Sequence, residues 1–224
     1  MRPVLGAERH VFAILLSTQR SAPPTLVLIG LIAWIWVTPP VNIDTVRVSL
    51  FAQFALAAWL GHATGGSEDP AQELISTSHL GSATRLLLAK WLTATAIAAA
   101  VPLVILAGTF SYDQFVLRAQ LPRFTPEQAV ASAVAFVVVA VTGASLGVLA
   151  TSTLPRHPGW ATVALAILSL AQAAPWMAPV TPLAAALPAR GQPLPAALAP
   201  TVALGLLGGG ALLAAARIIR RPAG

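Results

Sequence analysis

The sequence predicts an all-α polytopic membrane protein that forms a single domain over residues 1–224. Apolar residues make up 57% of the chain, charged residues only 9%, and the mean hydropathy is +0.79. This composition is typical of chains that use the bilayer as the solvent for most of their surface. The apolar residues also gather in runs that approach the ~20 residues a spanning helix needs, with polar connectors between them.

Six hydrophobic spans are expected from these runs, with both termini on the same side of the membrane. If the N-terminus is cytoplasmic, nine Lys and Arg residues fall on the inner side and four on the outer side. Basic residues are disfavoured in short translocated loops, so this bias predicts cytoplasmic termini, as an even number of crossings requires. The expected spans are Pro24–Thr38, Val48–Ala63, Trp91–Phe110, Ala129–Thr151, Trp160–Trp176 and Leu198–Ala216.

The first 22 residues are expected to form an amphipathic helix along the inner leaflet. At 100° per residue, apolar side chains such as Val4, Phe12 and Leu15 gather on one side, and Arg2 and Arg9 lie opposite. That pattern is typical of interfacial helices. The alternative is a generic basic N-terminal anchor.

The connector between the second and third spans, Thr64–Lys90, is polar and has helix boundary signals. Pro70 suits the first turn of a helix with acidic residues near its N-terminus, Gly81 suits its end, and Ser82 suits the start of the next helix. We therefore expect a helical hairpin on the side of the termini. The alternative is a solvated loop that obeys the positive-inside rule.

Residues 73–92 resemble the cytoplasmic stretch between spans two and three of ABC-2 type permeases. In that family an acidic residue begins a short coupling helix, a Ser/Thr-rich turn and a small-residue segment with an Arg follow, and a Lys precedes span three. This chain has Leu74-Ile75 and His79-Leu80 where the family usually has Gly-Thr and a Pro. The resemblance implies that a separate ABC ATPase subunit docks here, on Glu73, Ser76, Thr77, Ser78, His79, Leu80, Gly81, Thr84 and Arg85.

The segment between the last two expected spans, residues 174–195, is too apolar for an ordinary aqueous loop, yet its prolines forbid one straight helix. Broken backbone at membrane depth requires protein or a water-filled cavity around it, so a re-entrant or interfacial segment is expected. The alternative is an alanine-rich loop lying on the outer leaflet. In ABC-2 exporters a re-entrant pair at this place helps to close the outer gate, which implies as gate candidates Pro175, Trp176, Pro179, Pro182 and Pro188.

Within the expected spans the polar features predict packing rather than chemistry. Four polar residues in the spans are expected to make hydrogen bonds between helices rather than substrate contacts: Gln53, Thr142, Ser169 and Gln172. Pro102 and Pro200 are expected to kink the third and sixth spans. Two pairs of glycines at i, i+4 spacing, Gly143/Gly147 and Gly205/Gly209, predict close helix contacts.

No Asp, Glu, Lys or Arg falls in the middle of an expected span, although ion-coupled carriers typically need such a group. The chain has no cysteine, no Gly-x-x-x-x-Gly-Lys-Ser/Thr phosphate loop and no His-Glu-x-x-His zinc motif. We therefore expect a protein that is not an enzyme and that binds no cofactor or metal itself. ATP and Mg would be bound by the partner subunit.

The expected function is the permease subunit of an ATP-driven exporter of an amphipathic drug, peptide or lipid. Its expected partners are the ATPase, a second permease copy or a sister permease, and membrane lipids, but not nucleic acid. The scarcity of Lys and Asn, with abundant Ala, Arg and Pro, indicates a GC-rich bacterial genome. The expected location is the bacterial plasma membrane. Two alternatives stay open: a carrier or channel that works without ATP, and a non-transporting scaffold or immunity protein.

Overall fold

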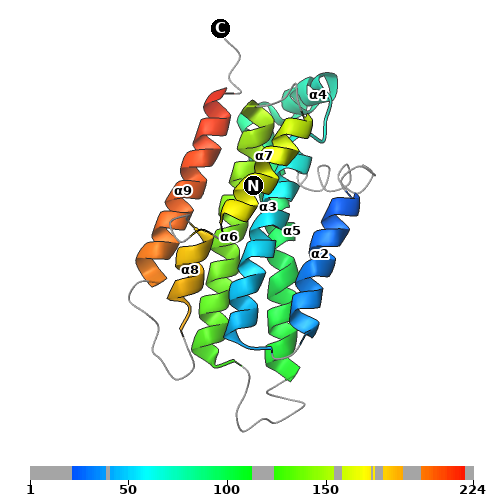
Figure 1. The fold of residues 1–224 in the computed structure, drawn as a ribbon. Coiled ribbons are helices and arrows are strands. Elements are labelled where there is room, and N and C mark those ends of the chain that lie inside the picture. The colour runs from blue at the N-terminus through cyan, green and yellow to red at the C-terminus, as the bar shows by residue number, and fades with distance from the viewer. Residues whose placement is uncertain are drawn as a thin grey trace.

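The computed structural model describes residues 22–38, 41–112, 124–153, 158–172, 174, 179–188 and 198–219, which fold into a helical bundle without strands (Figure 1). All of the expected N-terminal interfacial helix except Ala22 lies outside the described residues. The helices are α2 (Ala22–Val37), α3 (Ile43–Gly65), α4 (Pro70–Leu80), α5 (Ala83–Ser111), α6 (Pro126–Thr153), α7 (Pro158–Ala171), α8 (Val180–Ala186) and α9 (Leu198–Ile219).

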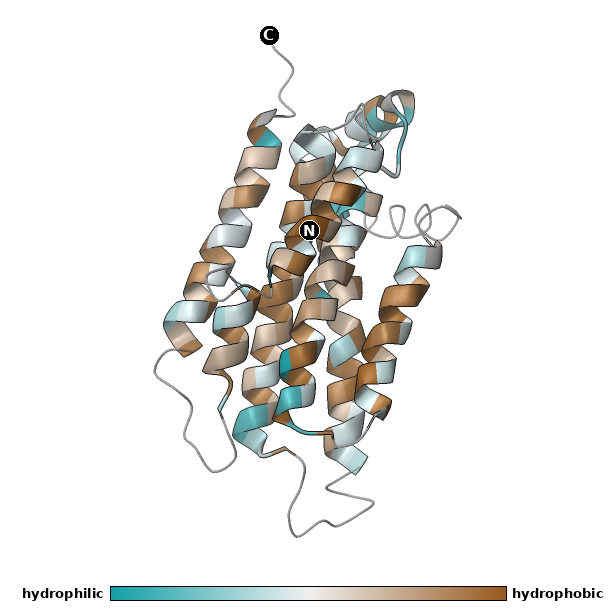
Figure 2. Ribbon diagram, in the orientation of Figure 1, coloured by the Kyte–Doolittle hydropathy of each residue, from teal (hydrophilic) through white to brown (hydrophobic). Residues whose placement is uncertain are grey.

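Four of these helices, α3, α5, α6 and α9, are long and apolar enough to cross a membrane. α2 and α7 are also apolar but shorter. Apolar residues follow the length of the bundle, and hydrophilic residues gather toward its two ends (Figure 2). The predicted membrane class is therefore supported for the four long helices.

One end of the bundle holds α4 and the end of α9, and we call it the α4 end (Figure 1). α2 starts below α4 and runs away from it, so that its last turn and the first turn of α3 lie at the opposite end.

The centre of the bundle is the pair α3 and α6, whose backbones approach very closely at glycines. A Cβ placed on Gly147 would collide with the carbonyl oxygen of Ala58, and one on Gly61 would collide with that of Ala144. At Gly143 the added atom would lie 2.9 Å from the carbonyl oxygen of Phe54. The close contact predicted from Gly143 and Gly147 is confirmed, because only glycine lets the helices meet at this distance.

The partner glycines of α3, Gly61 and Gly65, have the same i, i+4 spacing, although no contact was predicted from them. A Cβ on Gly65 would lie 2.9 Å from the hydroxyl oxygen of Thr151. That hydroxyl lies 2.9 Å from Nδ1 of His62. Close backbone approach and side-chain hydrogen bonding therefore occur together at the α4 end of the α3–α6 pair.

The second glycine pair, Gly205 and Gly209, lies on α9 and faces α6. A Cβ on Gly205 would collide with Val138, and one on Gly209 would lie 2.9 Å from a methyl carbon of Val141. Both predicted glycine pairs therefore mediate packing between helices of one chain.

Gln53 compensates for a backbone defect that Pro102 creates in α5. Proline has no N–H, so Pro102 cannot donate to the carbonyl of Ala98 four residues earlier. The side-chain nitrogen of Gln53, which is fully buried, donates to that carbonyl oxygen at 2.6 Å. The interhelical hydrogen bond predicted for Gln53 is confirmed, and it joins α3 to α5. The same prediction is wrong for Thr142, whose hydroxyl donates to the carbonyl of Val138 within α6.

Replacing Gln53 with leucine should destabilise the fold by about 1–3 kcal/mol, because the buried Ala98 carbonyl loses its partner. In a Pro102→Ala background the same replacement should cost less, because the introduced alanine supplies the backbone N–H that proline lacks. Unfolding by denaturing detergent of the four proteins in this double-mutant cycle measures the difference. An equal cost for Gln53→Leu in both backgrounds would show that the two residues do not act on the same carbonyl.

Candidate functional site

The short helix α4 has well-formed boundaries at both ends. Asp69 is its N-cap and accepts a hydrogen bond from the backbone N–H of Gln72 at 2.8 Å, and Pro70 occupies the first turn. The helix ends at Gly81, whose φ of 67° is left-handed and favours glycine. The helix start and stop predicted at Pro70 and Gly81 are confirmed.

Next to α4, a lysine and a glutamate form a buried ion pair. Nζ of Lys90 lies 2.9 Å from Oε2 of Glu68, and both side chains are completely inaccessible to solvent. The hydroxyl of Ser76 donates to the other carboxylate oxygen of Glu68 at 2.6 Å. Glu73 lies near the same lysine, with its Oε1 4.0 Å from Nζ.

These four residues, Glu68, Glu73, Ser76 and Lys90, are called the α4 anchor. They belong to three parts of the chain: the turn after α3, the helix α4, and the first third of α5. Because a buried charge without its partner costs several kcal/mol, the ion pair should hold these parts in one arrangement. The α4 anchor therefore links α4 mechanically to α5.

The helix start predicted at Ser82 is confirmed, because Ser82 is the N-cap residue of α5, which begins at Ala83. Lys90 therefore lies inside α5, just before the expected third span. The 29 residues of α5 measure about 43 Å, and a bilayer core is about 30 Å thick. The extra length leaves room for Lys90 to lie near the membrane edge, where Glu68 meets it.

The two sides of α4 have an unusual distribution of polarity. Glu73, Ser76 and Thr77 follow i, i+3 and i+4 spacing and so share one side of α4, the side of the α4 anchor. All three are half-buried. On another side Leu74 and Ile75 are 73% and 59% exposed. Ser78 and His79 are exposed as well, so α4 presents a mixed apolar and polar outer surface that a partner can contact.

The predicted coupling residues are only partly brought together. Glu73 and Ser76 join the α4 anchor, and Thr77, Leu80 and Thr84 are half-buried. The remaining four are exposed, and of these the guanidinium of Arg85 donates to the carbonyl of Leu80 at the end of α4. They are Ser78, His79, Gly81 and Arg85.

The residues missed by sequence reasoning are Glu68 and Lys90. Both stood in the predicted hairpin, but neither was assigned to the site. Their separation of 22 positions gives no local signal of pairing. One signal in the sequence could have indicated an ion pair. Several acidic residues lie at the start of α4, and a single lysine lies at the start of the next apolar run.

A second polar cluster holds α8 in place at the end of the bundle opposite α4. Arg47 of α3 donates from Nε to the carbonyl of Ala184 and from Nη2 to that of Leu187, both at 3.0 Å. Its Nη1 lies 2.8 Å from the Asp44 carboxylate. Gln128 of α6 donates to the carbonyl of Pro188 at 3.1 Å. The carbonyls of the last turn of a helix lack a full set of partners, and here that of Ala184 otherwise accepts a long bond from the N–H of Leu187, at 3.4 Å. Arg47 and Gln128 therefore cap α8.

α8 continues the path of α7 after a break. α7 runs from the α4 end to the middle of the bundle, and α8 runs on toward the opposite end (Figure 1). The expected fifth span to Trp176 is therefore too long, because α7 ends at Ala171. A proline at 175 cannot donate to the carbonyl of Ala171. The hydroxyl of Thr181 donates to the carbonyl of Gln172 across the break.

Three of the expected gate residues are described, and they mark the two ends and the first turn of α8. Pro179 is its N-cap residue, Pro182 lies in its first turn, and Pro188 follows its end. Pro175 and Trp176 lie outside the described residues.

Replacing Arg47 with methionine should free α8, because two of its terminal carbonyls lose a charged donor. The expected cost is about 2 kcal/mol in the free energy of unfolding. Ala186, which is 7% exposed, should become accessible. Since the natural chain has no cysteine, Ala186→Cys provides a unique thiol whose rate of maleimide modification should rise.

Arg47→Lys is the matched control for charge. A lysine keeps the positive charge but lacks the planar guanidinium that donates to two carbonyls at once. The stability and the thiol modification rate of Arg47→Lys should therefore lie between those of the natural protein and of the methionine variant. Unchanged stability and unchanged thiol modification in Arg47→Met would contradict the capping role.

The described residues thus define an all-helical bundle with four helices able to cross a membrane, a surface hairpin fixed by a buried ion pair, and a helix interrupted inside the bundle. Comparisons with family models, curated proteins and solved structures gave no match to this chain. Among the described residues, no three His, Asp or Glu side chains lie close enough together to hold a metal ion.

Proposed function

We propose that this chain is the membrane-spanning permease subunit of an ATP-driven transporter of the ABC-2 type, working with a separate ATPase subunit. The observation that carries the proposal is α4: a capped helix at one end of the bundle that is fixed to α5 by the buried Lys90–Glu68 pair and exposes Leu74 and Ile75. A partner that pushes on this helix would move the membrane helices with it.

Six membrane crossings are part of the proposal. α3, α5, α6 and α9 provide four of them. α2, with 16 residues, measures about 24 Å, which a short or locally thinned crossing can accommodate. α7 and α8 in tandem measure about 31 Å along their axes, close to the thickness of a bilayer core.

An even number of crossings is supported by the path of the described chain, because α2 runs away from the α4 end and α9 runs toward it (Figure 1). Together with the excess of basic residues, this favours a cytoplasmic α4 end and cytoplasmic termini in a bacterial plasma membrane.

In the proposed mechanism, binding of ATP closes the ATPase subunits and displaces α4. The displacement passes through the α4 anchor to α5 and through the turn at Gly66 to α3. α3 moves α6 with it, because the glycine contacts leave no space between these helices. The ATPase thereby biases two arrangements of the membrane helices, as a ligand with different affinity for two states does.

The partners follow from this mechanism. ATP and Mg are bound by the ATPase subunit, and a second copy of this chain or a sister permease completes the translocation path. The substrate is an amphipathic drug, peptide or lipid, and the direction is export.

The ATPase contact is tested by purifying the natural chain from its own cells in mild detergent. A protein with a phosphate loop and an ABC signature should co-purify with it. Replacing Leu74 and Ile75 together with aspartate should weaken this association by about tenfold or more, because charged groups cannot be buried in an apolar contact without a large cost. Leu74→Met with Ile75→Leu is the matched control and should retain the partner.

Two results would contradict the proposed function. Flux or another biological activity of the purified chain in vesicles that contain no ATPase would contradict the proposal and favour an ATP-independent carrier. Modification of Ser78→Cys by an impermeant maleimide in intact cells would place α4 outside and contradict it as well.

A further inference from the structure

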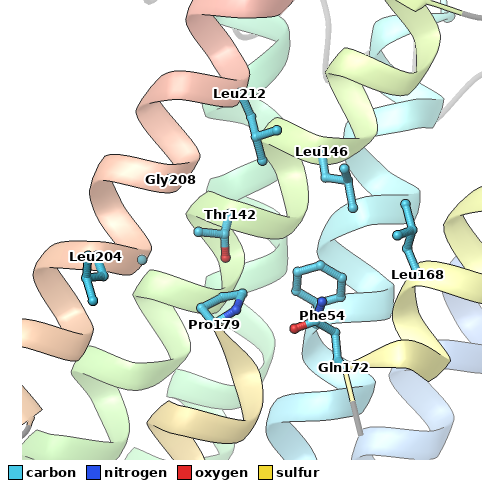
Figure 3. Close-up of a pocket in the computed structure, with 10 residues that line it drawn as sticks. Phe54, Thr142, Leu146, Leu168, Gln172, Pro179, Leu204, Gly208 and Leu212 are labelled. Atoms are coloured by element: carbon cyan, nitrogen blue, oxygen red, sulfur yellow. The ribbon is translucent and has the colours of Figure 1, made fainter. Parts of the chain in front are cut away.

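The break between α7 and α8 borders a pocket of about 230 Å³ inside the bundle. α9 forms one wall with Leu204, Gly208 and Leu212, and Leu168 of α7 lies on the opposite side (Figure 3). Phe54 of α3 and Thr142 of α6 lie behind it. The volume is below the range of roughly 300–1,000 Å³ that drug-sized ligands occupy. The pocket therefore suits a narrow ligand or one part of a larger one.

None of the described residues that line the pocket is ionisable, and their polar groups are few. Gln172 and Thr142 are 3% and 4% exposed. The Thr142 hydroxyl donates to the carbonyl of Val138 in its own helix at 2.9 Å, so it can only accept from a ligand. A charged ligand group would lose its hydration here without gaining a partner.

Gln172 provides a donor to the pocket. Its Oε1 accepts from the backbone N–H of Val180 at 3.4 Å, so the NH₂ group is the part of the amide left to bind a ligand. In Figure 3 the amide oxygen points toward Pro179 and the amide nitrogen lies beside Phe54, and all three residues line the pocket. The NH₂ group can donate to an uncharged oxygen there.

The pocket lies beside an interrupted helix, which is a second, independent indication that it binds a ligand. Gln172 and Pro179, on either side of the break, both line it. In a membrane, irregular backbone is tolerated only where protein surrounds it or where it lines a cavity. Transporters place their binding sites at such interrupted helices. Leu204, on the rim, is 68% exposed, so the pocket opens toward the side of the bundle that apolar residues cover.

We propose that this pocket binds the uncharged part of a lipid-like molecule: a single hydrocarbon chain carrying a neutral oxygen that accepts a hydrogen bond from Gln172. The proposal goes beyond the transport function and does not depend on the ATPase, because binding occurs in the isolated chain. It requires only that the bundle lies in a bilayer.

The test uses the full chain purified in detergent without any ATPase. A long-chain fatty alcohol that carries a photoreactive diazirine in its chain is bound and illuminated, and the labelled residues are mapped by mass spectrometry. Labelling should be saturable and should concentrate on Leu168, Leu204 and Leu212. An unlabelled alcohol should compete better than the alkane of equal length, because only the alcohol can accept from Gln172.

Two glycines of α9 give a matched pair of variants. A side chain added at Gly208, which lines the pocket, meets no atom within 4 Å, and the same holds at Gly210, which does not line it. Gly208→Leu should fill the pocket and reduce labelling by about tenfold, whereas Gly210→Leu should label like the natural chain. Both variants should keep the elution volume and the unfolding midpoint of the natural protein.

Three outcomes would overturn the proposal. One is labelling spread without saturation over lipid-facing residues such as Leu170 and Leu207. Another is unchanged labelling in Gly208→Leu. The third is cross-linking between two protomers at Leu204 or Leu212, which would show that a second copy of the chain occupies this place.

Discussion

Lys90→Met should destabilise the protein by about 3–5 kcal/mol, the largest effect expected of any substitution in the α4 hairpin. The variant leaves the carboxylate of Glu68 buried, with the Ser76 hydroxyl at 2.6 Å but without its cation. Methionine fills most of the space of the lysine stem, so the loss should come from charge rather than from a cavity. Unfolding by denaturing detergent measures it.

The matched control is the double variant Lys90→Met with Glu68→Gln. It removes both charges while keeping an oxygen that can accept from Ser76, so most of the stability should return. Replacing a buried pair by neutral groups is often close to neutral. If the double variant lost as much free energy of unfolding as the two single variants together, Lys90 and Glu68 would not be energetically coupled. A loss below about 0.5 kcal/mol in Lys90→Met would place the pair in the class of surface salt bridges.

Gly147→Ala is the second substitution with a large expected effect. The added Cβ collides with the backbone carbonyl of Ala58, which cannot move aside as a flexible side chain can. We expect destabilisation by about 3 kcal/mol, at the upper end of the cost of overpacking. The loss should be visible in detergent unfolding and in the yield of folded protein.

Gly30→Ala in α2 is the control, because its Cβ meets no atom within 4 Å. The same chemical change there should be neutral or stabilising by up to about 1 kcal/mol, through the higher helix propensity of alanine. Gly61→Ala should push the same two helices apart, so combining it with Gly147→Ala should cost less than the sum. Equal stability of Gly147→Ala and Gly30→Ala would contradict the close packing of α3 and α6.

The sequence was sufficient to predict the four long helices of this fold. Apolar runs of the right length coincide with the four long helices, because helix formation in a bilayer follows directly from backbone hydrogen bonding. The boundaries of α4 were also predictable, since Pro70 and Gly81 are local signals. Gly143 and Gly147 indicated a tight contact, although the partner helix could not be named.

Pairings between distant residues were beyond the sequence. Nothing local indicates that Lys90 meets Glu68 or that Arg47 caps α8. Both depend on how helices far apart in the chain are placed side by side. The sequence also did not predict that the expected fifth span divides into α7 and α8, since the apolar run continues past Ala171 and only the prolines beyond it indicate a break.

The sequence and the structure support the proposed function in different ways. The support from the sequence is the resemblance of residues 73–92 to the coupling segment of ABC-2 permeases. The support from the structure is the α4 anchor and the exposed pair Leu74 and Ile75. Of the predicted coupling residues, Glu73 and Ser76 take part in the link to α5, whereas Ser78 and His79 are exposed and can meet a partner directly.

The most direct test of the central claim is photo-crosslinking from position 75 in living cells. A photoreactive amino acid replaces Ile75, and a control replaces Val104, which is 70% exposed in the apolar part of α5. If α4 docks on an ATPase, position 75 should form an adduct with a protein that contains a phosphate loop, and the yield should change when ATP is depleted. Position 104 should label no ATPase. Adducts of position 75 with lipid alone, in cells that carry out the transport, would contradict it.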